Sequence, residues 1–177
     1  MLSNLWTLLR HLGLDAADTR HVLKPAAVQR LAQRVASSEQ RHTGQVRVCI
    51  ETSLPLGDLW RHVRHGQSMA TLVRERALSL FGELRVWDTE HNNGVLVYML
   101  LAERSIELVA DRGLGRILAA QQWDAMVASL AADLNAGLFE QGLTLALDEV
   151  SAQLERHFPA PQGSARNNEL PDAPVLL

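Results

Sequence analysis

Hydrophobic residues in the first half of the chain recur at two spacings, which predict helices and one strand. Apolar positions within residues 28–35 recur at helical spacing and follow Pro25, a residue that suits the first turn of a helix. Residues 46–51 alternate between apolar and other side chains, which is typical of a strand. A helical stretch in two pieces around Gly66 comes next, and its second piece ends near Gly82.

The middle of the chain has the pattern of a β-hairpin followed by two helices. Residues 95–101 are almost continuously apolar, which is typical of a central strand covered on both faces. A polar turn centred near Arg104 leads into alternating residues at 106–110, which predicts an antiparallel partner strand. Apolar residues at helical spacing then mark helices within 123–134 and 139–158.

This order of elements predicts an α/β fold in which a small mixed sheet of three to four strands carries helices on both faces, in three α/β/α layers. Because crossover connections are right-handed, the strands at 46–51 and 95–101 should be parallel. We expect an N-terminal amphipathic helix and linker at 1–23, an α/β domain at 24–158 and a tail at 159–177. The tail is rich in Pro, Gly, Ser and Asn, so we expect it to be disordered.

The N-terminal stretch is rich in leucine and predicts a short amphipathic helix. Packing of its apolar face on the rest of the chain is the first interpretation, and docking on a protein partner or peripheral contact with a membrane is the alternative. No stretch reaches the roughly 20 apolar residues of a transmembrane helix, and no signal-peptide pattern is present, so we expect a cytoplasmic protein. The leucines of this face are Leu5, Leu8, Leu9 and Leu12.

Composition narrows the function mainly by exclusion. Among 177 residues, 17 Lys and Arg stand against 20 Asp and Glu, and the formal net charge of −3 argues against nucleic acid as a partner. Cys49 is the only cysteine, so disulfides and cysteine-based metal sites are excluded. Residues 61–65 form a solvated basic stretch in the first interpretation, with His62 and His65 as metal ligands in the alternative.

Two polar loops should meet at one end of the hairpin, because residues equally far from its turn face each other. The oxygens of Asp88, Asn93 and Asp111 are the ligands that Ca²⁺ or Mg²⁺ prefers, so these three residues are the candidate metal site. Arg112 suits a phosphate or carboxylate, and His91 is a candidate ligand or proton carrier. The competing interpretation is structural, since Asp and Asn are common turn residues. No catalytic residue can be assigned from the sequence.

The run from residue 84 to residue 113 resembles the TPM-domain family, formerly a domain of unknown function. Three features carry the resemblance: Asn-Asn-Gly-Val-Leu at 92–96, the Glu103-Arg104 turn, and the loop at 111–114. A Gly-x-Phe-x-x-Gly pattern at 137–142, before the last helix, matches as well. The resemblance covers roughly residues 24–158 and implies the α/β fold predicted above.

For function, the resemblance implies an auxiliary role, and an enzymatic activity is the alternative. The family includes an auxiliary factor of photosystem II repair and an accessory protein of an acetylcholine receptor. Acid phosphatase activity has been attributed to some members and divalent-metal binding to others. We therefore expect an accessory or binding module that acts through a protein partner. A metal-assisted phosphatase and an arginine-dependent binder of phosphorylated ligands are the alternatives.

Overall fold

The computed structural model describes residues 10–11, 13, 22–118, 120–161 and 168–177. These described residues form six helices and four strands. Along the chain, the elements are α3 (Pro25–Ser38), β1 (Gln45–Glu51), α4 (Leu56–His65), α5 (Met69–Glu83), β2 (Gly94–Leu100), β3 (Ser105–Ala110), α6 (Arg112–Gly115), α7 (Ala120–Asn135), α8 (Phe139–His157) and β4 (Val175–Leu176).

The four strands form one mixed sheet in the order β3-β2-β1-β4. β1 and β2 are parallel, with Gln45 opposite Gly94, so the predicted parallel pairing is confirmed. β2 and β3 are antiparallel, with Val95 opposite Ala110, as the hairpin pattern predicted. The expected α/β fold with a small mixed sheet is therefore the fold of this chain.

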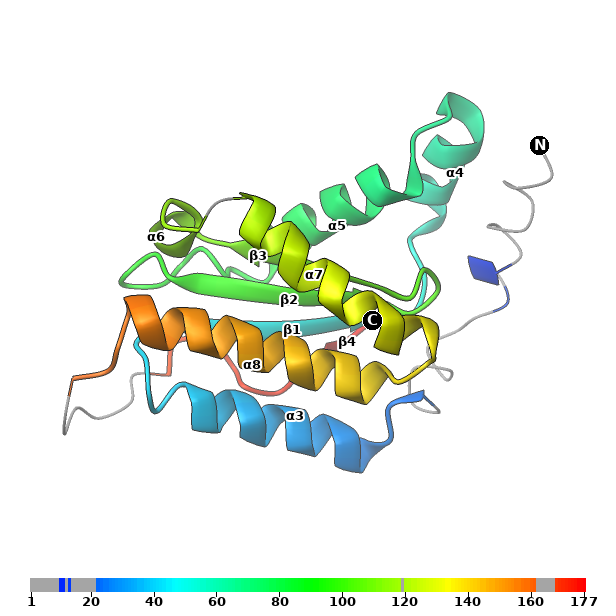
Figure 1. Ribbon diagram of the computed structural model, residues 1–177. Helices are drawn as coiled ribbons and strands as arrows, with labels where there is room; N and C mark the ends of the chain where they lie inside the picture. The colour runs from blue at the N-terminus through cyan, green and yellow to red at the C-terminus, as the bar shows by residue number, and fades with distance from the viewer. Residues whose placement is uncertain (1–9, 12, 14–21, 119, 162–167) are drawn as a thin grey trace.

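Alternating side chains on the strands divide the core into two layers. Val46, Val48 and Ile50 of β1 pack in the layer with α3, α7 and α8. Cys49 and Tyr98 point to the other face of the sheet and pack in the layer with α5. Figure 1 shows α5 on one side of the sheet and α3 and α8 on the other. All seven residues of β2 are buried, which explains why its sequence is apolar without alternation.

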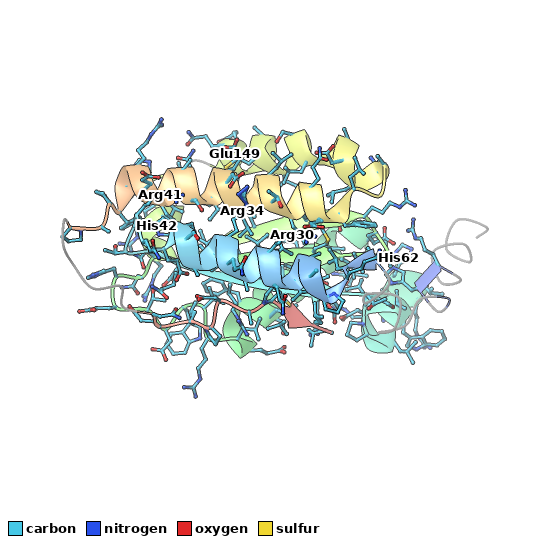
Figure 2. All side chains as sticks on the ribbon, turned by 90° about the horizontal axis from the view of Figure 1, so that it is seen from below. Arg30, Arg34, Arg41, His42, His62 and Glu149 are labelled. Atoms are coloured by element: carbon cyan, nitrogen blue, oxygen red, sulfur yellow. The ribbon has the colours of Figure 1, made fainter. Side chains whose placement is uncertain are left out.

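α3 and α8 lie side by side (Figure 2), and three ion pairs join α3 and the residues just after it to α8. Exposed pairs of this kind contribute less than about 1 kcal/mol each, so the row aligns the two helices more than it stabilises them. The pairs are Arg30–Glu140 at 2.7 Å, Arg34–Asp148 at 3.3 Å and Arg41–Glu155 at 3.1 Å.

The tail corrects one prediction, because residues 168–177 are docked on the sheet and not disordered. Val175–Leu176 forms β4, which pairs in parallel with the end of β1. Gln45 Oε1 accepts hydrogen bonds from the backbone N–H groups of Glu169 (2.9 Å) and Leu170 (3.2 Å). The exposed edge of β1 offers backbone groups that a short segment can pair with, and composition does not reveal such pairing.

The N-terminal leucines Leu5, Leu8, Leu9 and Leu12 lie outside the described residues. Arg10 and His11 are described, and both contact Glu103 in the turn between β2 and β3. In the part of the chain that the structure describes, no helix is long and apolar enough to cross a membrane.

Candidate functional site

Two loops meet where β2 begins and β3 ends, as the hairpin geometry predicted. The backbone N–H of Asp111 donates to Gly94 O (2.9 Å), and that of Gly113 donates to Asn92 O (2.7 Å). The loop that precedes β2 and the turn that follows β3 are therefore joined directly through their backbones.

Two glycines make this close approach possible. A Cβ atom on Gly94 would lie 2.0 Å from Val86 O, and one on Gly113 would lie 2.5 Å from Asn92 O. Both distances are far below van der Waals contact, and the atoms in the way belong to the backbone. The glycines of the Asn-Asn-Gly and Asp-Arg-Gly runs are therefore required by packing, whatever the site binds.

Arg112 is held at the rim of the site by both loops. Its Nη2 donates to Asn92 Oδ1 (2.6 Å), and its Nε lies 3.6 Å from Asp111 Oδ1. The side chain remains largely exposed. Asn92 has a positive φ of 50°, a conformation that Asn tolerates better than most residues, and this turns its side chain toward Arg112.

Asp111 is 6% exposed and uses only one of its two carboxylate oxygens. Oδ1 accepts the backbone N–H of Arg112 (2.6 Å), which caps the first turn of α6. Oδ2 is buried and has no hydrogen-bond partner among the described residues. A buried carboxylate oxygen without a donor is costly, so a cation or a hydrogen-bond donor placed against it would stabilise the site.

The other two candidate metal ligands have different surroundings. Asn93 is buried, and its Nδ2 donates to Thr43 Oγ1 (3.2 Å), which ties the loop to the residues before β1. Asp88 is exposed on the loop after α5. Within the described residues, no three His, Cys, Asp or Glu side chains gather into a metal-binding group. Asp111 is thus the best-placed oxygen ligand of the three.

An open cleft of about 510 Å³ lies beside these loops, and we call it the Arg112 cleft. Arg112 and Arg116 stand four residues apart on its wall, and His91 stands on the opposite loop. Arg116 forms no ion pair with any described residue. The cleft is therefore cationic and suits an anion better than a metal ion. It is lined by His91, Asn92, Arg112, Gly113, Arg116 and Ile117.

A Ser–His–carboxylate arrangement that the sequence did not reveal lies at the opposite end of the sheet. His11 Nε2 donates to Glu103 Oε1 (2.9 Å), and His11 Nδ1 lies 3.2 Å from Ser53 Oγ. The same Nδ1 accepts the backbone N–H of Leu54 (3.2 Å), and the His11 side chain has no exposed surface. These contacts hold His11 itself against Ser53, Leu54 and the turn between β2 and β3. No sequence signal could have found it, because 92 residues separate His11 from Glu103.

Comparison with known proteins supports the fold and leaves the activity open. Residues 16–153 match the TPM domain. The NMR structure of the BA42 protein from the psychrophilic bacterium Bizionia argentinensis is similar, with a TM-score of 0.70 and 21% sequence identity, over 86% of this chain and 94% of that one. At that identity the likeness shows a shared fold. No curated protein matches this chain.

Proposed function

This chain belongs to the TPM domain family, and we propose that it is a binding module which takes a phosphate or carboxylate group into the Arg112 cleft. The observation that carries the proposal is the pair of arginines, Arg112 and Arg116, one helical turn apart on the cleft wall. Guanidinium groups bind phosphate and carboxylate oxygens with two parallel hydrogen bonds. Asn92 holds Arg112 in place, so little side-chain freedom is lost when an anion binds.

The anion would belong to a protein partner if the chain has the accessory role that its family resemblance implies. A phosphorylated residue, or an Asp or Glu side chain, has the required chemistry. The cleft is open to solvent, since Arg112 and His91 are both exposed. A group on the surface of another protein can therefore reach it.

A metal-assisted phosphatase is the second candidate, and Asp111 is the observation that favours it. Its buried Oδ2 is the kind of ligand atom that Ca²⁺ or Mg²⁺ takes, and it is left without a partner by the described residues. Asp111 would hold the ion, with Asp88 and Asn93 as further oxygen ligands. A bound divalent ion would supply the positive charge that polarises a phosphoryl oxygen.

The binding proposal is tested by titrating the protein with inorganic phosphate and following each backbone amide by NMR. We expect the amides of residues 91–93 and 112–117 to shift together. Arg116→Ala should weaken binding about 10-fold, since a hydrogen bond to a charged group contributes about 1.5 kcal/mol or more. Arg156→Ala, which removes an exposed arginine on α8, is the matched control and should leave binding unchanged. Equal affinity of the Arg116 variant and the wild type would refute the proposal.

The phosphatase candidate needs a separate assay with a phosphomonoester in the presence of Mg²⁺, Ca²⁺ or Mn²⁺. Asp111→Asn should abolish metal-dependent hydrolysis but leave phosphate binding at Arg116 intact. If purified protein shows no hydrolysis with any of these ions, the second candidate fails while the binding proposal stands.

A further inference from the structure

One side of α4 carries exposed apolar residues next to a basic residue. Leu56 is 71% exposed and Trp60 is 61% exposed, the two largest values among the large hydrophobic side chains of the described residues. Leu56, Trp60 and Arg64 are spaced four residues apart, so they form one line along the helix, which we call the α4 row. A tryptophan this exposed has a large unfavourable contact with water.

The rest of the domain fixes this row in its outward position. Leu59, which precedes Trp60 and lies about 100° around the helix from it, is 2% exposed and belongs to the core layer under α5. His62 Nδ1 lies 2.6 Å from Gln67 O, which ties α4 to the loop that follows it. Trp60 cannot turn inward without pulling Leu59 out of the core. Its exposure is thus imposed by the fold.

The charges around the row are positive. Arg64 and His65 make no ion pair with any described residue, and both are exposed. Arg61 is engaged by Asp58 (3.3 Å) and by Glu75 (2.5 Å), so its charge is balanced. The uncompensated positive charge of α4 therefore lies at Arg64, directly beside Trp60.

We propose that the α4 row docks this protein on an anionic lipid surface. Trp60 and Leu56 would enter the boundary between headgroups and acyl chains, where tryptophan is favoured, and Arg64 would reach the lipid phosphates. A lipid surface fits better than a protein, because two projecting side chains fall far short of the about 800 Å² that each partner buries in a stable protein interface. Figure 1 shows α4 projecting from the body of the domain.

The Arg112 cleft would stay open in this arrangement. It lies where β2 begins, whereas α4 follows the end of β1. Figure 2 shows the same separation, with His42, next to the start of β1, at one end of the molecule and His62 of α4 at the other. Docking through α4 therefore does not depend on the proposed anion binding.

The test is co-sedimentation of the full-length protein with vesicles of phosphatidylcholine alone or mixed with phosphatidylserine. Binding should require phosphatidylserine and weaken as salt is raised. Trp60→Ala should lower the partition coefficient about 10-fold, because the apolar surface of the indole no longer enters the bilayer. Arg64→Glu should lower it about 25-fold, because each unit of positive charge near an anionic surface contributes about a 5-fold change and the substitution changes the charge by two units.

Two matched variants separate the α4 row from other surfaces. Trp87→Ala removes a 48% exposed tryptophan on the loop after α5 and should bind vesicles as the wild type does. A Leu5→Asn and Leu9→Asn double variant tests the N-terminal leucines and should retain most of the binding. The proposal is overturned if Trp60→Ala and Arg64→Glu bind like the wild type, if vesicles without phosphatidylserine bind equally well, or if only the N-terminal double variant loses binding.

Discussion

The two ends of the sheet differ in how completely their buried carboxylates are paired. Where β1 ends, Glu51 is 5% exposed, and its oxygens accept hydrogen bonds from Arg76 (2.8 Å) and from the Tyr98 hydroxyl (2.7 Å). Where β3 ends, Asp111 is buried to a similar degree, but the described residues leave its Oδ2 without a donor. A fully paired buried group holds the fold together, whereas an unpaired one is available to a ligand.

The histidines at the two ends show the same contrast. His11, at the end with Glu51, has partners at both ring nitrogens and no exposed side-chain surface. His91, at the end with Asp111, is exposed on the wall of the Arg112 cleft. The hydrogen-bonded side chains at the first end therefore hold the fold together, and the other end is the better candidate site.

The largest expected effect comes from Glu51→Ala. Removing one partner of a buried ion pair typically costs about 3 to 5 kcal/mol, because the remaining charge and the Tyr98 hydroxyl lose their partner. Arg76 is partly exposed, so we expect a loss near the lower end of this range. Urea unfolding measures it, and a loss below about 1 kcal/mol would show that this network is not structural.

A smaller effect, which depends on pH, is expected at Glu103. Burial raises the pKa of this carboxyl, but the hydrogen bond from His11 and the charge of Arg10 outweigh it and lower the pKa below 4.5. The stabilisation is therefore present above about pH 4.5 and is lost as the pH falls through the lowered pKa.

Glu103→Gln removes the charge and keeps an acceptor for His11. Its stability should fall below that of the wild type by about 1 kcal/mol at pH 7, and the difference should shrink as the pH falls below 4.5. Glu155→Gln, at an exposed ion pair, is the control and should show a small difference at every pH. A Glu103 difference that grows toward low pH would contradict the assigned sign.

At the other end of the sheet, Asp111→Asn should change stability by less than about 1 kcal/mol, in clear contrast to Glu51→Ala. The amide keeps an oxygen for the Arg112 N–H and removes a buried charge whose Oδ2 has no donor among the described residues, while it gives up the long ion pair with the largely exposed Arg112 side chain. Thermal unfolding of Asp111→Asn and Glu51→Ala under the same conditions measures the two losses of stability. If both lose the same stability, the two carboxylates do not differ in role.

The smallest effect is expected at Cys49, where we predict no reaction at all. Burial, together with the negative charge of Glu51, raises the pKa of this thiol to about 12. At pH 8 the folded protein should therefore not react with a thiol reagent, since only the thiolate is nucleophilic. Reaction should appear when urea unfolds the chain, and rapid labelling without urea would show that this layer of the core opens.

Local patterns in the sequence predicted most of the fold. The unbroken apolar run at 95–101 identified the central strand, because only a strand covered on both faces tolerates it. The spacing about Arg104 placed Asn92 near Arg112, which the hydrogen bond between them confirms. The metal-ligand role of Asp88, Asn93 and Asp111 stays a prediction, although the structure already shows that their surroundings differ.

By itself, the sequence determined the helices, the hairpin and the meeting of the two polar loops, because these depend on periodicity and on contacts between nearby residues. Only the tertiary structure decided which polar groups are paired. Gln45 meets the tail across 124 residues, and His11 meets Glu103 across 92. Hydrogen bonds over such distances leave no periodic signal, so burial and pairing, which separate a structural carboxylate from one free to bind, appear only once the chain is folded.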